Sequence, residues 1–283
     1  MSLQAFIPNY WASSFIEVLE RSHVFGQENV VNRDYEGDIR EAGDTVTIAG
    51  IGEVAIFDYT KNSDMPAAEA LAAADTKLII DQAKGFNFFV DDVDRRQGIP
   101  GFVNGYMRRA ARNQRDRSDT LIAGFYASAG SAVATSGAPK TDLGTAGKAY
   151  EYLVDLSVLL DENDVPAEER WVAVPPWYHG ALLKDDRFVK SGTAGGEQRL
   201  LNGQVGEAAG FAVLKSNNVS NDGTTYRVMA GVPMAITFAE QLDQIEAYRP
   251  ERRFGDAIKG LRLYGAKVTR PEALAVAFVN RPT

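Results

Sequence analysis

The segment ERWVAVPPWYHGALLKDDRFVKSG, residues 169–192, holds the side chains whose types and spacing come nearest to a catalytic pattern. It carries His179 directly after two aromatic residues, and Asp185 and Asp186 follow. A histidine base needs a nucleophile, or a carboxylate that orients it, within hydrogen-bond reach. On a helix the two aspartates would lie almost two turns beyond His179, and the chain has no G-x-S-x-G elbow to supply a serine. The pattern therefore favours a histidine packed at the start of a helix over a catalytic one.

Three other stretches resemble ligand-binding motifs but lack features that these motifs require. GIGEVA (50–55) has the spacing of a dinucleotide fingerprint, but its last residues read as a strand and not as the helix that would meet a pyrophosphate. GTAGKA (144–149) lacks the first glycine and the hydroxyl of a phosphate loop. VDDVD (90–94) lacks the glycine and the closing glutamate of a calcium loop. The sequence predicts no catalytic residue, no cofactor and no metal site, so we do not expect an enzyme.

The composition excludes further classes of site. The 283 residues include no cysteine, which rules out disulfides and thiolate metal sites. The two histidines, His23 and His179, are too few for a multi-histidine metal centre. A net charge of −8 argues against a dedicated nucleic-acid-binding protein, which would normally be basic. No apolar run approaches the length of about 18 residues that a membrane span needs.

A β-hairpin is expected in the first quarter of the chain, in GDTVTIAGIGEVAIFDYT (43–60). Val46 and Ile48 alternate with threonines, a turn follows at Gly50–Gly52, and Val54 and Ile56 alternate again. The flanking residues are charged or small and offer little to cover the hairpin. A two-stranded hairpin alone is marginal in water, so we expect this one to pack on another subunit.

A long strand and a long helix are expected next. Residues 77–92 are rich in β-branched and aromatic side chains, and Gly85 is the expected position of a bulge. From Phe102 to Tyr126 apolar residues recur at helical spacing. The nearly opposite face of this helix carries Arg108, Arg112, Arg115 and Asp119.

A glycine-rich segment, 128–147, separates this part from one in which strands and helices alternate. Such alternation predicts an α/β module. The expected elements are a helix at 148–162, a strand at 170–175, a helix at 176–185, a strand at 210–217, and C-terminal strands broken at Pro271.

Four stretches together resemble the major capsid protein of tailed bacteriophages, which has the Hong Kong ninety-seven shell fold. They are FIPNYWASSFIEVLERSHVFGQENVVNRDYEG (6–37), VPAEERWVAVPPWYHGALLKDDRFVKSG (165–192), NGQVGEAAGFAVLKSNNV (202–219) and FGDAIKGLRLYGAKVTRPEALAVAFV (254–279). The resemblance spans nearly the whole chain and keeps the order of the elements. It implies an α+β fold and self-assembly into the icosahedral shell that encloses a phage genome.

The resemblance assigns a role to each part of the chain. The expected parts are an N-terminal arm (1–30), an extended hairpin loop over a neighbouring subunit (31–65), a peripheral domain with a strand and a spine helix (66–144), an axial domain (145–245), and the C-terminal strands of the peripheral domain (246–283).

Two sets of residues are expected at contacts. The hairpin loop should hold its neighbour without covalent bonds, because no lysine between Val31 and Thr60 could form an isopeptide bond. Its expected contact residues are Arg33, Asp34, Glu36, Asp38, Arg40, Glu41, Val46, Ile48, Val54 and Ile56. In related shells the long helix runs near the inner surface, so Arg108, Arg112 and Arg115 are expected to face the lumen and to touch packaged double-stranded DNA or a scaffolding protein. A solvated face neutralised by Asp116 and Asp119 is an equal alternative.

The implied partners are other copies of the chain, in pentamers and hexamers, packaged DNA, and a decoration protein. Some relatives carry a long charged helical scaffolding segment that this chain lacks, so we expect either a separate scaffolding protein or assembly without scaffolding. No membrane partner is expected, and the location is the virion capsid after assembly in the host cytoplasm. Two alternatives stay open: an encapsulin-type shell around cargo enzymes, and an α/β enzyme that uses His179.

Overall fold

The structure is a computed structural model of the chain. The N-terminal residues 1–22, the stretch GIGEVA and most of the expected hairpin loop lie outside the residues that it describes. The described residues are 23–35, 45–48, 58, 61, 64, 76–91, 102–145, 147–185, 206–252 and 254–282.

The described elements combine a few helices with many strands. The helices are α3 (Phe102–Ala123), α4 (Lys148–Glu162) and α5 (Pro176–Leu183), with 3-10 turns η2 (Gly124–Ser128), η3 (Pro233–Ala235) and η4 (Pro271–Ala273). The strands are β1 (Thr45–Ile48), β2 (Thr76–Ile79), β3 (Gln82–Asp91), β4 (Ser131–Val133), β5 (Trp171–Val174), β6 (Glu207–Ala208), β7 (Phe211–Lys215), β8 (Thr225–Gly231), β9 (Ile236–Tyr248), β10 (Gly255–Val268) and β11 (Leu274–Asn280).

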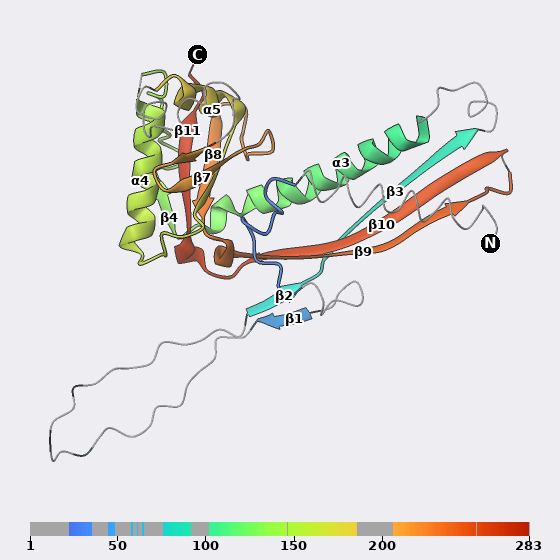
Figure 1. The fold of residues 1–283 in the computed structure, drawn as a ribbon, viewed down its shortest axis with the longest axis horizontal. Helices are drawn as coiled ribbons and strands as arrows, with labels where there is room; N and C mark the ends of the chain where they lie inside the picture. Colours follow the sequence, from blue (N-terminus) through green and yellow to red (C-terminus); the bar gives the residue numbers. More distant parts are fainter. Residues whose placement is uncertain are drawn as a thin grey trace.

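These elements form a block at one end and a long extension (Figure 1). The block contains a six-stranded sheet with α4 and α5, and the extension consists of α3 above a three-stranded sheet. A small sheet of β1 and β2 lies below the start of the extension (Figure 1).

The six-stranded sheet has the order β4-β11-β8-β5-β7-β6 and mixes parallel with antiparallel pairs. The apolar runs WVAV in β5 and LAVAFV in β11 are buried throughout, as strands covered on both faces require. Helix α4 packs against β4 and β11. Its fully buried Leu153, Leu156 and Leu160 recur at helical spacing and form the face that packs.

The three-stranded sheet has the order β3-β10-β9 and is antiparallel throughout. Helix α3 packs on one face of it, in an apolar cluster that includes Met107 and Phe86. Glycine at position 260 leaves room for the Phe86 ring, because a Cβ atom there would lie 2.5 Å from it and the ring would have to shift. The β9–β10 register shifts between Leu261 and Arg262, and bulges of this kind re-aim nearby side chains.

Residues 23–33, which we call the strap, connect the block with the extension. Phe25 is buried in the main core and lies edge-on to the ring of Trp171 in β5, with centroids 6.5 Å apart. Asn32 joins the edge of β9: its carbonyl accepts the N–H of Phe238 at 2.9 Å. The strap therefore packs on both sheets.

The boundary expected between an arm (1–30) and a loop (31–65) falls inside the strap. Val30 and Val31 are both fully buried, so the chain does not leave the folded body between them. The first exposed residue after the buried part is Asp34.

The single strand expected at 77–92 is instead two strands. β2 and β3 are separated at Ile80, which is buried in a small cluster with Leu78 before the chain enters the three-stranded sheet. The bulge expected at Gly85 is also wrong: Gly85 pairs in regular register with Leu261.

Only the first strand of the hairpin expected at 43–60 lies in the described residues, as β1. β1 pairs antiparallel with β2, and Ile48 lies opposite Thr76. The expected second strand, with Val54 and Ile56, lies outside the described residues. The backbone groups of β1 thus find partners about 30 residues further along the chain.

The C-terminal strands divide between the two large sheets. β10 pairs with β3, whereas β11 lies between β4 and β8 in the six-stranded sheet. The expectation that residues 246–283 group with the strand at 77–92 is therefore wrong for β11. Likewise β4 leaves the part expected at 66–144, and β9 leaves the part expected at 145–245 for the three-stranded sheet. The apolar run of β11 needs cover on both faces, and the larger sheet with α4 supplies it.

Leu156→Ala in α4 is expected to lower the free energy of unfolding by about 2–5 kcal/mol, because a fully buried side chain leaves a cavity. Val158→Ala on the same helix is the matched control: its side chain is 47% exposed, and the change should stay within about 0.5 kcal/mol. Denaturant unfolding followed by circular dichroism measures both. Equal effects of the two substitutions would contradict the packing of α4 described above.

Candidate functional site: an ionic junction and two exposed faces

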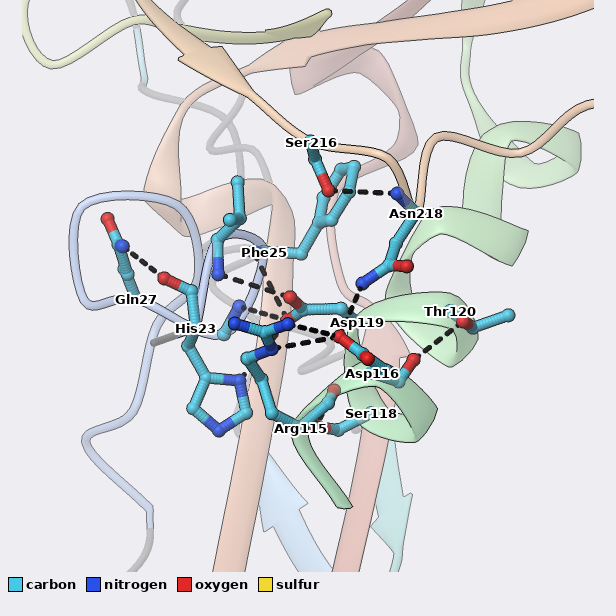
Figure 2. Close-up of polar contacts among 12 residues, drawn as sticks. His23, Phe25, Gln27, Arg115, Asp116, Ser118, Asp119, Thr120, Ser216 and Asn218 are labelled. Carbon is cyan, nitrogen blue, oxygen red and sulfur yellow. Dashed lines mark hydrogen bonds and ion pairs between the residues drawn. The ribbon is translucent and has the colours of Figure 1, made fainter. Parts of the chain in front are cut away.

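Asp119 of α3 is the acceptor at the centre of a buried polar cluster (Figure 2). Its carboxylate accepts the backbone N–H groups of Val24, Phe25 and Gly26 at 3.2–3.3 Å. Nδ1 of His23 lies 3.2 Å from the Oδ1 atom of the same carboxylate. The Asp119 side chain is fully buried, so these four contacts replace the water that a carboxylate otherwise needs.

Gly26 sets the local conformation of the strap. A Cβ atom at this position would lie 2.8 Å from Nδ1 of His23, which is closer than real Cβ contacts. Glycine therefore lets the histidine ring lie against the turn with Nδ1 toward Asp119. The side-chain amide of Gln27 donates to the carbonyl of His23 and closes the turn.

Arg262 of β10 extends the cluster on the other side of His23. Its guanidinium donates to Nε2 of His23 at 3.2 Å, to the Gln114 carbonyl at 3.2 Å and to Oγ of Ser118 at 3.3 Å. It also forms an ion pair with Glu240 on the neighbouring strand β9. The Arg262 side chain is 1% exposed, so its charge depends on these partners.

Glu240 joins Arg262 to Arg33 of the strap. Its Oε2 atom pairs with Arg262 and its Oε1 atom pairs with Arg33. Arg33 also donates to the carbonyl of Gly26 at 3.2 Å and lies over the ring of Phe238, 5.6 Å from its centroid. We use the term ionic junction for His23, Asp119, Arg262, Glu240 and Arg33.

The contacts of His23 fix its tautomer. A guanidinium can only donate, so Nε2 accepts from Arg262 and the ring proton lies on Nδ1, from which it is donated to Asp119. Burial lowers the pKa of His23 and outweighs Asp119, which raises it. The cations Arg262 and Arg33 lower this pKa further. At neutral pH the histidine is therefore neutral, and the cations of Arg262 and Arg33 balance the carboxylates of Asp119 and Glu240.

The ionic junction ties the strap to α3, β9 and β10 at one place. Buried charges are tolerated only when they are paired and hydrogen-bonded, and removing one partner generally costs about 3–5 kcal/mol. The arrangement suits the positioning of elements, because each group is engaged by another part of the same chain.

The ionic junction was not predicted from the sequence. The helical spacing placed Asp119 on the same face of the long helix as the arginines that were expected to be exposed. The four positions do share a helical face, but the C-terminal half of α3 enters the block, where the strap covers that face and buries Asp119. One signal was available. Arg262 stands between Leu261 and Leu263 in an expected C-terminal strand, and an arginine inside such a strand requires acceptors if its face is buried.

The arginine face of α3 differs from the expected row. Arg108 and Arg112 are exposed, and so is Arg109. Arg115 is half-buried and pairs with Asp116 at 2.5 Å, so it does not belong to the free cationic surface. The alternative of a neutralised face holds in part, because Asp116 pairs with Arg115 of the expected row, whereas Asp119 is buried in the junction. We use the term arginine face for three exposed arginines of α3 at neighbouring positions: Arg108, Arg109 and Arg112. Among the described residues, no carboxylate pairs with them.

Most described residues of the expected hairpin loop are engaged within their own chain. Arg33 belongs to the ionic junction, and Ile48 is half-buried against the cluster around Leu78. Asp34 is exposed. Ile79 of β2 points away from this cluster and is 54% exposed. The other expected contact side chains lie outside the described ones: Glu36, Asp38, Arg40, Glu41, Val46, Val54 and Ile56.

The segment around His179 belongs to the core of the block. Tyr178 is fully buried and its hydroxyl donates to the carbonyl of Ala149 at 2.7 Å. His179 is 4% exposed, and its Nε2 has no hydrogen-bond partner in the part of the chain that the structure describes. Burial lowers the pKa of His179, and the cation of Lys215 adds to this. The surroundings fit a packed histidine and provide no orienting carboxylate among the described residues.

Two further findings concern metal binding and membrane spans. Within the described ranges, no group of three or more histidine or carboxylate side chains is placed to hold a metal ion. In the same part of the chain, no helix has the length and apolarity to cross a membrane.

Asp119→Asn is expected to lower the free energy of unfolding by about 1–3 kcal/mol, because the buried N–H donors of the strap lose a charged acceptor. Asp155→Asn, at an exposed position of α4, serves as the control and should change stability by about 0.5 kcal/mol or less. Chemical unfolding measures the two variants side by side. If Asp119→Asn is as stable as its control, the carboxylate does not hold the strap.

Comparison with known proteins identifies the family. The sequence matches the family described as phage capsid protein over residues 75–277. No curated protein sequence matches the chain. A structure from Mycobacterium phage Che8 is similar at 30% identity and a TM-score of 0.73, over 90% of this chain and 91% of that chain. The capsid of cyanophage P-SCSP1u is similar at 17% identity and a TM-score of 0.66, over 86% and 85%. The virus-like particle from Pyrococcus furiosus is similar at 14% identity and a TM-score of 0.60, over 94% and 97%.

These matches confirm the resemblance seen in the sequence and the α+β fold expected from it. The block, the long extension and the strap are thus parts of a shell subunit. The chain belongs to the phage capsid protein family: it is a tailed-phage major capsid protein of the Hong Kong ninety-seven fold that self-assembles into the icosahedral shell around the genome.

Proposed function

We propose that the shell is built from pentamers and hexamers of this chain, that it is assembled in the host cytoplasm, and that the subunit is not an enzyme. The similarity to the Mycobacterium phage Che8 structure carries the proposal, because it combines 30% identity with coverage of about nine-tenths of both chains. The proposed partners are packaged double-stranded DNA, a separate scaffolding protein and a decoration protein, besides other copies of the chain.

The two large sheets support a division of the subunit into two domains with different contacts in the shell. The six-stranded sheet with α4 and α5 would be the axial domain, which meets its copies around the five-fold and six-fold axes. The three-stranded sheet with α3 as its spine would be the peripheral domain. Residues 1–22 would be the arm and residues 36–75 the extended loop. Compared with the division expected from the sequence, β4 and β11 would move to the axial domain and β9 to the peripheral domain. The arm and the loop would be separated by the strap, whereas they were expected to meet between residues 30 and 31.

Electron microscopy of purified particles tests the proposal against its alternative. A phage capsid should appear as shells with five-fold and six-fold capsomers, and particles from infected cells should contain DNA. An encapsulin-type shell would contain protein cargo and no DNA. The likeness to the virus-like particle from Pyrococcus furiosus does not favour this alternative, because at 14% identity it shows the fold alone. His179→Ala should still assemble, and loss of a hydrolytic activity in that variant would revive the enzyme alternative.

The arginine face is the proposed contact with packaged DNA. Arg108, Arg109 and Arg112 project from neighbouring positions of α3 into solvent, without carboxylate partners among the described residues. Such a surface binds phosphates without reading sequence, and the affinity falls as salt rises. A chain with a net charge of −8 would otherwise repel DNA. A local cationic face on the lumen side would offset this repulsion where the DNA lies.

Replacing Arg108, Arg109 and Arg112 together by glutamine is expected to reduce packaged DNA per particle, or to let DNA escape at lower salt, while shells still form. Arg115→Gln is the control, because this side chain is paired with Asp116 and should matter little. DNA mass per particle and the salt dependence of its release are measured. Unchanged DNA with unchanged scaffold content would remove the arginine face from both proposed roles.

The sheet of β1 and β2 is a proposed contact with a neighbouring subunit. Its outer face presents Ile79, whereas its inner face uses Ile48 within the chain. An exposed isoleucine that becomes fully covered contributes about 1.5–3 kcal/mol, more than the 0–1 kcal/mol of an exposed ion pair. Apolar cover should therefore dominate over the charges of the loop.

Ile79→Asp is expected to leave the subunit folded and to weaken or stop assembly, because the side chain is exposed in the single chain. Ile48→Asp is the contrasting variant: it should lower the stability of the subunit itself, because Ile48 packs on the cluster around Leu78. Thermal unfolding of subunits and particle yield separate the two effects. Normal shells from Ile79→Asp would show that this face is not an interface.

A further inference from the structure

We propose that the ionic junction is an acid-sensitive latch, which holds the strap on α3 and the three-stranded sheet while His23 is neutral and loosens it when His23 takes up a proton. The latch is a property of the single chain and does not rest on the assignment of any shell contact. A failure of the proposal would therefore leave the capsid function untouched.

In the described part of the chain, the hydrogen-bond partner of Nε2 is a donor, so a second ring proton would meet no acceptor there. Nδ1 of His23 already donates to Asp119, and Nε2 faces the donor nitrogen of Arg262 at 3.2 Å. Protonation would place an N–H group against an N–H group. The hydrogen bond from Arg262 would be lost, and two cations would be in contact.

The charges that face His23 from each neighbouring element show how the balance changes. Asp119 faces it from α3, Arg262 from β10 and Arg33 from the strap itself, while Glu240 of β9 pairs with both arginines. With neutral His23, the cations of the two arginines are balanced by the two carboxylates. Protonation adds one uncompensated positive charge, and the side chains of His23 and Asp119 are too deeply buried for water to screen it.

The direction of the pKa shift agrees with this geometry. The pKa of His23 is lowered from its ordinary 6.5, mainly by burial, so the released strap binds a proton more readily than the held strap. The latch is therefore at full strength above pH 6.5 and weakens as the pH falls below this value. The equilibrium constant between the held and the released strap changes by up to tenfold per pH unit, which corresponds to about 1.4 kcal/mol. Ordinary Asp and Glu side chains titrate near 3.9 and 4.3, roughly a unit or more below the range from pH 7.5 to 5.5 in which the histidine acts.

Release would act first on the bonds that Asp119 makes to the strap. The N–H groups of Val24, Phe25 and Gly26 all end on this carboxylate, so the strap depends on a single acceptor at this end. In sequence the strap leads to residues 1–22 on one side and to residues 36–44 on the other. The state of His23 would thus set how firmly both flanking segments are tethered to the folded body.

Hydrogen exchange of purified particles at pH 7.5, 6.5 and 5.5, read by mass spectrometry, tests the latch. Rates are corrected for the intrinsic effect of pH, and peptides from α4 serve as the internal reference. Protection of residues 24–33 should fall by up to about tenfold per pH unit below 6.5 in the wild-type chain. The chain offers a matched pair of variants, because it has two histidines and both are buried. His179→Gln should behave like wild type at the strap, and His23→Gln should show no pH-dependent loss, because glutamine cannot take up the proton.

Two results would overturn the proposal: wild-type protection that stays constant down to pH 5.5, or a loss of protection in His23→Gln that follows that of wild type. Arg33 provides a second, independent arm in case His23→Gln does not hold the strap at any pH. Arg33→Gln removes a cation that lowers the pKa of His23, so release should move to higher pH. Arg33→Lys keeps the charge and should keep the midpoint. Equal midpoints in these two variants would show that Arg33 supports the strap without any link to the titration of His23.

Discussion

Buried charged side chains are tolerated in this subunit only when each one is paired and hydrogen-bonded. That constraint fixes where the strap, helix α3 and the three-stranded sheet meet. Asp119 needs donors, and the turn of the strap presents three successive N–H groups to it. Arg262 needs acceptors, and the neighbouring strand supplies Glu240. Apolar surfaces tolerate small slides against one another, whereas hydrogen bonds lose strength steeply when their geometry changes. The ionic junction therefore sets the register between strap, helix and sheet.

Stability and register come from different parts of the molecule. The main core of the block contains the fully buried strands β5 and β11 and supplies most of the apolar burial. The clusters under α3 and around Leu78 are much smaller. The extension has less apolar core of its own. Hydrogen bonds and ion pairs near its base therefore contribute more to the position of its elements than they would inside the block. The bulge between Leu261 and Arg262 lies at this base, where it helps to direct Arg262 toward the helix.

The sequence predicted elements whose pattern is local and strong. The apolar run of β5, the leucine spacing of α4 and the long helix α3 were each visible without knowledge of their partners, and the family resemblance followed from their order. The expectations that proved wrong depend on distant pairing. The strand expected at 77–92 is two strands in different sheets, and β11 leaves β10 for the larger sheet, because strand partners are chosen by burial over the whole fold. The ionic junction was missed for the same reason. His23 and Arg262 are 239 residues apart, and periodicity alone cannot show that one covers the other.

The two ends of α3 illustrate why a single helical face can serve two purposes. Arg108 and Asp119 lie on the same angular face, separated by roughly 16 Å along the axis. Near Arg108 the face is open to solvent, where unpaired arginines are tolerated because water solvates them. Near Asp119 the strap covers the face, and a charge remains there only because the backbone of the strap solvates it in place of water. Since the helix is continuous between these points, the junction that fixes one end also fixes the direction in which the arginine face points relative to the block.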